Sequence, residues 1–309
     1  MRNLRERRKA RYIVFRTDFA FKKFFGTKAN KTLLIHFLNS LFELKNENQI
    51  TDITYLNSEQ LPKEEDERRA VFDVYCETNH GERFIVEMQK NMQKNFKNRS
   101  LFYATFPIQE LSDRGNNWDF SLAKIFVIGV LDFTFDNQKP NKVITKVQFK
   151  DEEGDVFNDR LNFVYIELPK FHKEDNQLKT IMDEWLFLIK NLYRLRDRPK
   201  NIQSKIFDRL FSTAEICNLS KMEFKDYSRS LKDYRDWKNS LDYAIEQKSK
   251  KILKKTMAKG IAKGMEKGMA KGIKENQIES AKKMLDKNFD IELIAEISGL
   301  PLEEIKKLK

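Results

Sequence analysis

Two short stretches that alternate like β-strands, joined by a polar turn, constrain this chain more than any other feature. The stretches are residues 70–76 and 83–90, and the turn residues lie at 79–81. With that turn as the pivot, Asp73 lies directly opposite Glu87. Directly opposed residues share a face, with Cβ atoms about 4.5–5.5 Å apart, and like charges there destabilise a sheet. The pairing of two carboxylates therefore predicts a cation between them, and a divalent metal is the simplest one.

The face that carries these carboxylates has further members. Gln89 points the same way as Glu87, because side chains alternate along a strand. Asp73, Glu87 and Gln89 therefore form one polar cluster. The same register places Val71 opposite Gln89, and the cluster is surrounded by the apolar side chains of Val71, Tyr75 and Ile85. The alternative is a solvated face on which the two charges repel one another loosely.

The composition indicates a folded protein with a polyanionic partner. The chain has 309 residues, of which 40% are apolar and 25 are phenylalanine, so it can bury a sizeable core. The formal net charge of +12 favours nucleic acid as the partner, followed by an anionic membrane surface. A protein that is simply rich in lysine is the alternative.

Cysteine usage and hydropathy predict a soluble, cytoplasmic protein. Only Cys76 and Cys217 are present, which argues against a disulfide scaffold and against a cysteine zinc site. The basic N-terminus is not followed by the apolar stretch of a signal peptide. The longest apolar run, residues 125–131, is too short to span a bilayer.

Strand and helix patterns are interspersed up to about residue 200, which predicts an α/β core with a mixed sheet. A first helix begins at Thr17-Asp18 and is interrupted at Gly26. The other expected helices are 30–44, 96–113 and 176–196. The expected strands are 51–56, 69–77, 83–90, 123–133, 143–149 and 161–168.

From residue 211 onward the sequence pattern predicts helices only. Ser220 and Glu223 have the spacing of a capping box at the start of an amphipathic helix. Residues 258–273 repeat a four-residue unit of the type Ala-Lys-Gly-Ile. Its four glycines each cost a helix about 1 kcal/mol relative to alanine. The repeat is therefore either a marginal helix that needs a partner or a lysine-rich linker.

The C-terminal tail, residues 291–305, has helix-turn-helix spacing around Gly299. A helix that reads DNA presents basic or amide side chains at its N-terminal end, whereas Glu303 and Glu304 there would repel phosphate. We expect a small helical hairpin used for packing or self-association, and a homo-oligomer formed through the C-terminal helices.

The hairpin with its acidic pair resembles the PD-(D/E)XK nuclease core, and other segments extend the resemblance. In their order and spacing they are similar to the Rpn family of recombination-promoting nucleases and transposases. These segments are residues 18–25, 86–89, 99–103 and 166–171, the Lys-Gly repeat and residues 297–300. The resemblance implies a restriction-endonuclease-like core, a mixed central sheet flanked by helices, with an all-helical C-terminal extension.

The resemblance also implies roles for individual residues. Asp73 and Glu87 would bind Mg²⁺ or another divalent cation, and Asp18 would complete the metal shell. An N-cap is the alternative for Asp18. Gln89 occupies the position of the superfamily lysine and can only orient water or phosphate. Lys22, one helical turn after Asp18, is a candidate to replace that lysine.

Arg99 and Tyr103 lie one helical turn apart and suit a phosphate contact. The alternative is that the arginine packs over a core tyrosine.

Three parts are expected: a basic arm at 1–16, a nuclease domain at 17–247 and a helical tail at 248–309. The expected function is a Mg-dependent DNA endonuclease of low sequence specificity in recombination or mobile-element processes. The alternative is an inactive module that binds nucleic acid or serves in assembly.

Overall fold

The computed structural model describes residues 10–60, 70–91, 95–112, 121–135 and 139–308. Most of the expected basic arm, residues 1–9, lies outside the described residues. The chain divides into two compact units, residues 1–235 and residues 236–309. No helix in the described part of the chain combines the length and the apolar character needed to cross a lipid bilayer.

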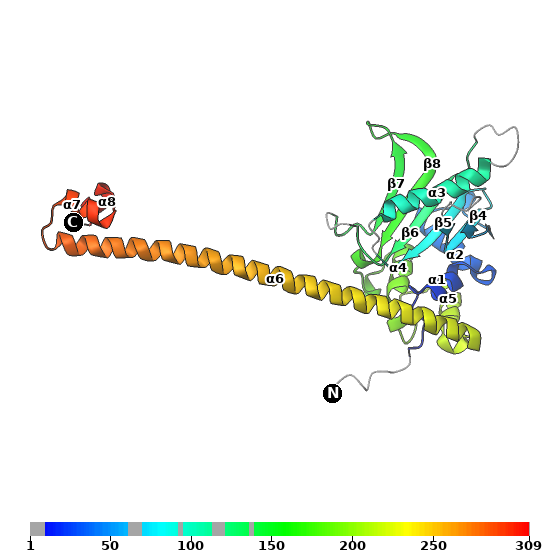
Figure 1. Ribbon diagram of the computed structural model, residues 1–309. Helices are drawn as coiled ribbons and strands as arrows, with labels where there is room; N and C mark the ends of the chain where they lie inside the picture. The colour runs from blue at the N-terminus through cyan, green and yellow to red at the C-terminus, as the bar shows by residue number, and fades with distance from the viewer. Residues whose placement is uncertain (1–9, 61–69, 92–94, 113–120, 136–138, 309) are drawn as a thin grey trace, which may run out of the picture. The chain divides into compact units, whose positions relative to one another are not determined.

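A mixed six-stranded sheet forms the centre of the first unit (Figure 1). Its strand order is β1-β4-β5-β6-β8-β7. The strands are β1 (Ile53–Tyr55), β4 (Val74–Thr78), β5 (Arg83–Gln89), β6 (Ile125–Leu131), β7 (Ile144–Lys150) and β8 (Val156–Glu167). The three central strands β5, β6 and β8 are parallel, and the outer pairs are antiparallel. The expected α/β architecture with a mixed sheet is confirmed.

Helices cover both faces of this sheet. Helix α3 (Phe96–Ser112) connects β5 to β6 and covers one face, where Tyr75, Ile85 and Tyr165 are buried. The opposite face packs against four helices, α1 (Asp18–Phe25), α2 (Lys31–Phe42), α4 (Ile181–Asn191) and α5 (Ile206–Ala214). Short 3-10 helices lie between these elements: η1 (Lys28–Asn30), η2 (Asn46–Asn48), η3 (Leu168–Lys170), η4 (Asp175–Gln177), η5 (Leu192–Arg194) and η6 (Ile216–Asn218).

Local caps fix where α1 begins and ends. The Thr17 hydroxyl accepts a hydrogen bond from the backbone N–H of Ala20, as an N-cap does. Gly26 ends the helix, and its N–H donates to the carbonyl oxygen of Lys22. A Cβ atom at Gly26 would lie 2.9 Å from that oxygen and 3.6 Å from the carbonyl oxygen of Asp73. The small residue at this position therefore lets the end of α1 lie against the backbone of Asp73.

The first arm of the hairpin differs from the expected continuous strand. It is split into β3 (Ala70–Val71) and β4, and β3 pairs with β2 (Glu59–Gln60) in a separate two-stranded sheet. Val71 pairs with Glu59, so the prediction that it lies opposite Gln89 was wrong. The cause is Phe72, whose buried ring packs on the same side as that of Tyr75. Two residues three positions apart share a face only if the strand is broken between them.

Helix 176–196 was also predicted too long. Helix α4 starts at Ile181, because Thr180 and Asp183 form a capping box there, and it ends at Asn191. Strand β8, in contrast, begins at Val156 rather than at residue 161. Its first half pairs only with β7 as an exposed hairpin, so no burial pattern marks it in the sequence.

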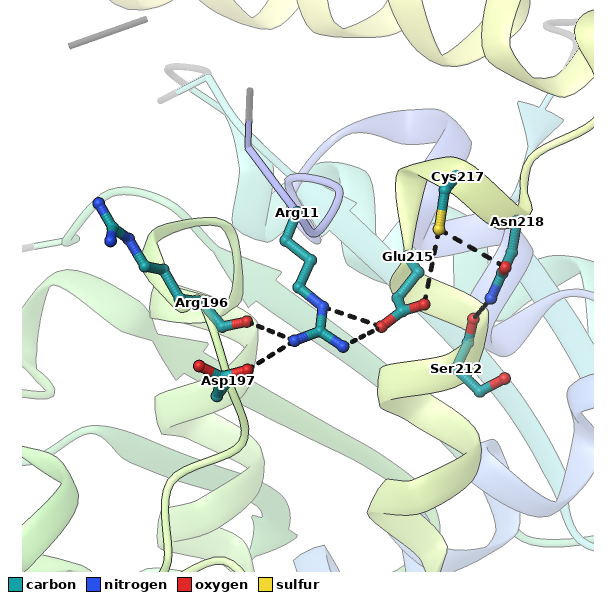
Figure 2. A network of polar contacts seen from close by, with 7 residues as sticks. All are labelled: Arg11, Arg196, Asp197, Ser212, Glu215, Cys217 and Asn218. Atoms are coloured by element: carbon teal, nitrogen blue, oxygen red, sulfur yellow. Dashed lines mark hydrogen bonds and ion pairs between the residues drawn. The ribbon is translucent and has the colours of Figure 1, made fainter. Parts of the chain in front are cut away.

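A polar network anchors the segment that leads into α1 (Figure 2). The Arg11 guanidinium donates to Glu215 Oε1 at 2.9 Å and 2.6 Å and to Asp197 Oδ1 at 2.6 Å. Tyr12 and Glu215 also form an isolated antiparallel bridge. Since the charged groups are partly exposed, the ion pairs contribute little free energy. Together with the buried Tyr12 ring, they fix the path of the chain between α5 and α1.

The second unit is helical, and its first helix begins within the first unit. Helix α6 (Lys221–Leu285) starts at the expected capping box of Ser220 and Glu223 and continues through the repeat 258–273, which is therefore helix rather than linker. Helices α7 (Ile291–Ser298) and α8 (Leu302–Lys306) form the expected hairpin around Gly299, whose φ is +68°. The hairpin packs on the end of α6 through a small core of Ala281, Ile294, Leu300 and Ile305.

Candidate active site

The hairpin brings Asp73 and Glu87 together. Val74 pairs with Val86, so the register continues to place Asp73 opposite Glu87. The backbone N–H of Asp73 donates to Glu87 Oε1 at 3.1 Å, and the N–H of Met88 donates to Asp73 Oδ2 at 2.8 Å. The juxtaposition predicted from the sequence is present in the structure. One oxygen of each carboxylate is held by the backbone, which leaves Asp73 Oδ1 and Glu87 Oε2 for a cation.

Burial makes these two charges costly. Glu87 is only 5% exposed, and burial together with the neighbouring Asp73 carboxylate raises the pKa of Glu87 to about 8. Burial also raises the pKa of Asp73. A desolvated carboxylate beside a like charge favours its protonated form. Without a cation the pair therefore retains a proton near neutral pH, and a bound cation would displace it.

Lys22 on α1 supplies one positive charge. Its Nζ lies 2.9 Å from Asp18 Oδ1 and 3.7 Å from Asp73 Oδ1. Burial lowers the pKa of Lys22, but the carboxylates of Asp18 and Asp73 outweigh burial, so the net shift is upward. Lys22 is thus a stable ammonium group that connects Asp18 to the acidic pair. Thr17 is the N-cap of α1, so the N-cap interpretation of Asp18 was wrong.

Helix α3 places Arg99 and Tyr103 near Glu87. Arg99 Nε donates to the Tyr103 hydroxyl at 2.6 Å, and the guanidinium carbon lies 4.8 Å from the centre of the tyrosine ring. Burial raises the pKa of Tyr103, and the charge of Glu87 raises it further. The positive charge of Arg99 acts in the opposite direction on the pKa of Glu87. The structure thus shows arginine packed over a buried tyrosine, within electrostatic reach of the acidic pair.

Gln89 lies two residues after Glu87 on β5. It is 9% exposed, and its Nε2 donates to the carbonyl oxygen of Asn91 at 3.1 Å. The next residue, Lys90, lies away from this face, with its Nζ 6.0 Å from the centre of the Tyr234 ring. Burial lowers the pKa of Lys90. Of these two residues, Gln89 continues the face of Glu87.

Sequence reasoning missed a second buried polar group beside this strand. Asp132 follows β6, and its N–H donates to the carbonyl oxygen of Gln89 at 3.0 Å. Its carboxylate binds the guanidinium of Arg16 and accepts a hydrogen bond from the Tyr234 hydroxyl at 3.0 Å. The group ties β5 and β6 to the segment before α1 and to the start of α6. An aspartate directly after a buried strand was the only signal for it in the sequence.

The donor set fits a magnesium ion. Mg²⁺ is usually held by one or two carboxylates, with water and substrate phosphate as the remaining ligands. Asp73 and Glu87 provide those two carboxylates on a rigid hairpin. In the described part of the chain, no group of three or more His, Cys, Asp and Glu side chains is arranged to hold a metal. Asp18 contacts Lys22 rather than completing such a group.

The chain matches a protein-family model. The model described as PD-(D/E)XK nuclease family transposase matches residues 15–244. The match contains the whole six-stranded sheet, both carboxylates of the hairpin, and helix α3. No curated protein and no solved structure matches the chain.

Proposed function

Because the chain belongs to the PD-(D/E)XK nuclease family transposases, we propose that it is a metal-dependent endonuclease that hydrolyses phosphodiester bonds of DNA with low sequence specificity. The observation that carries this proposal is the opposed pair of the half-buried Asp73 and the buried Glu87, both with raised pKa values. Perturbed carboxylates of this kind destabilise a fold and gather at functional sites. The processes served would be recombination or the movement of genetic elements.

The acidic pair would hold the divalent ion through Asp73 Oδ1 and Glu87 Oε2. When bound, Mg²⁺ lowers the pKa of a water ligand and neutralises charge on the phosphate. Asp73 and Glu87 keep their orientation because each accepts a backbone hydrogen bond. The pair would have to release the proton that it retains near neutral pH before it could hold the ion.

Two further residues would act on the substrate. The Lys22 ammonium group lies beside Asp73 Oδ1 and would bind a phosphate oxygen next to the metal, in place of the missing superfamily lysine. Asp18 would position that ammonium group rather than bind the metal. Gln89 cannot accept a proton at neutral pH and would orient water or phosphate through its amide. Arg99, held against Tyr103, would balance the charge of Glu87.

The partner would be DNA, bound largely through the phosphate backbone. The net charge of +12 supplies salt-sensitive affinity without sequence preference. We also propose self-association through the C-terminal helices, where Met257, Ile261, Met265, Met269 and Ile273 are exposed along α6. The competing proposal, an inactive module that binds nucleic acid, draws its support from Gln89 at the lysine position.

Cleavage of plasmid DNA with and without Mg²⁺ tests the proposal. We expect nicking by the wild-type protein that is lost with EDTA and falls at least a hundredfold in Asp73→Asn and Glu87→Gln. Glu153→Gln, an exposed carboxylate in the β7–β8 turn, serves as the matched control and should cleave normally. Nicking that persists in both site variants would refute the assignment, and DNA binding without any nicking would favour the inactive module.

A further inference from the structure

A cavity of about 590 Å³ lies on the α3 side of the sheet, between α3, β7 and β8. Its size falls in the range of small-molecule sites. Aromatic rings make up much of its wall, namely Phe135, Phe149, Phe163 and Tyr165. Phe149 is 47% exposed although it is large and apolar. The cavity therefore presents flat apolar surface to whatever enters it.

Three lysines surround the aromatic wall, namely Lys97, Lys139 and Lys142. Lys97 Nζ lies 4.8 Å from the centre of the Phe135 ring, so one positive charge sits directly over an aromatic face. No acidic side chain other than Glu167 lines the cavity among the described residues. The rim is therefore positive, and it suits a ligand that carries negative charge.

The inner end of the cavity is polar and buried. Glu167 is 3% exposed and Lys170 is 8% exposed, and Lys170 Nζ donates to Glu167 Oε2 at 2.9 Å. Glu167 Oε1 accepts a hydrogen bond from the backbone N–H of Phe135 at 2.8 Å. A ligand that reaches this end meets a fixed pair of opposite charges. Such a pair can contact hydrogen-bonding groups on the edge of a planar ring.

The cavity is separate from the acidic pair. Glu87 on β5, Gly129 on β6 and Tyr165 on β8 lie in one row across the parallel strands. Two strand spacings of about 4.8 Å place Tyr165 roughly 10 Å from Glu87. Phe96 of α3 packs over Gly129 between them, because a Cβ atom there would lie 3.2 Å from its ring. Neither Asp73 nor Glu87 lines the cavity.

We propose that this cavity binds one nucleotide of single-stranded DNA, with the base against the aromatic wall and the phosphate on the lysine rim. Proteins bind single strands by stacking bases on aromatic side chains within a positively charged groove. An apolar wall alone would accept many ligands, but a planar ring attached to a phosphate satisfies both the wall and the rim. A free nucleotide has the same chemistry, and the experiment separates the two sources.

Binding is measured by fluorescence anisotropy with labelled ten-residue oligodeoxythymidylate, in EDTA so that no metal-dependent cleavage occurs. Phe149→Ala removes an aromatic wall residue, and we expect roughly tenfold weaker binding. Phe157→Ala is the matched control, because Phe157 is 81% exposed on the partner strand and does not line the cavity. Its affinity should equal that of the wild type. Unlabelled thymidine monophosphate and a hairpin duplex serve as competitors.

A second pair of variants tests the rim. Lys139→Glu should weaken binding several-fold more than Lys146→Glu. The two changes alter the net charge equally, but Lys146 lies on the other side of β7, with its Nζ 5.6 Å from the Phe42 ring. Leu101→Asp changes a 49% exposed residue of α3 that also lines the cavity. It should weaken oligonucleotide binding as well, and it tests the proposal independently if Phe149→Ala disturbs the strand.

The outcomes are distinct. If excess thymidine monophosphate displaces the labelled oligonucleotide from the wild type and does so less well from Phe149→Ala, the cavity binds a free nucleotide. If only unlabelled single strands displace it, the cavity binds a DNA strand. Equal affinities in the two phenylalanine variants and in Leu101→Asp overturn the proposal. Because the assay contains no divalent ion, this result is independent of whether Asp73 and Glu87 support cleavage.

Discussion

At the scale of single residues, the opposed carboxylates Asp73 and Glu87 oppose folding rather than support it. Glu87 has a folded pKa of about 8 against an ordinary value of 4.5, so the folded protein binds a proton that the unfolded chain gives up. The stability that this proton provides is present below about pH 4.5 and is lost as the pH rises through about 8. A fold that keeps such a group without a bound cation is less stable than it could be.

Glu87→Gln should therefore stabilise the metal-free protein while abolishing cleavage. Glutamine retains an oxygen for the Asp73 N–H and has no charge to desolvate. We expect a gain on the order of 2 kcal/mol in the free energy of unfolding at pH 8.5, and no gain at pH 4.5. Urea unfolding in EDTA at both pH values measures it. Lower stability of the variant at pH 8.5 would contradict the interpretation.

Metal binding should depend on pH with a definite sign. Because an ion must displace the proton held by Asp73 and Glu87, we expect Mg²⁺ affinity and cleavage to rise between pH 6.5 and 8.5 and then level off. Calorimetry in two buffers of different ionisation enthalpy should show proton release on binding at pH 7. Binding without proton release at this pH would show that the pair is already ionised.

A specific contribution of Lys22 to the cleavage rate can be distinguished from a general electrostatic effect by comparison with Lys23, its neighbour on α1. Lys22→Ala should lower the cleavage rate at least tenfold at saturating Mg²⁺, and Lys22→Arg should restore part of it, because the charge beside Asp73 Oδ1 returns. Lys23→Ala is the control, since Lys23 pairs with Glu223 instead. Equal effects of the two alanine variants on single-turnover rates would exclude a specific role for Lys22.

At the scale of elements, the hairpin was predictable because its signal is local. Alternating strands and a polar turn fix the register, and Gly81 adopts a φ of +78° in that turn. The break before β4 was not predictable, since it depends on Phe72 packing against Tyr103 of α3 at a centroid distance of 5.0 Å. The group of Asp132, Arg16 and Tyr234 joins residues more than a hundred positions apart, and no local pattern encodes it.

Gly129 controls how closely α3 packs on the sheet. Gly129→Ala should destabilise the protein by about 1–2 kcal/mol, because the new methyl group would crowd the ring of Phe96. Gly264→Ala is the comparison, since that glycine has open space around it in α6, where alanine should instead stabilise the helix by about 1 kcal/mol. Thermal unfolding of the full chain compares the two. Unchanged stability in Gly129→Ala would show that Phe96 can move aside at no cost.

At the scale of the whole molecule, the two proposed functions belong to different parts of the chain. We assign cleavage to the region that matches the family and self-association to the C-terminal helices. The match ends at residue 244, and the exposed apolar residues Met257 to Ile273, which we propose for self-association, lie beyond it on α6. Deleting residues 248–309 should leave Mg²⁺-dependent nicking intact and reduce the mass in solution to that of a monomer. Light scattering and a plasmid assay measure the two properties. A folded product without nicking would place part of the active site in the tail.

Helix α3 has one flank toward the acidic pair and the other flank toward the aromatic cavity. Arg99 and Tyr103 face the acidic pair, whereas Lys97 and Leu101 line the aromatic cavity. A helix shifts as one rigid piece, so its two flanks cannot adjust independently. A ligand that displaces α3 when it binds on one flank would therefore change the free energy of binding on the other, and thermodynamic reciprocity requires this effect to be equal in both directions.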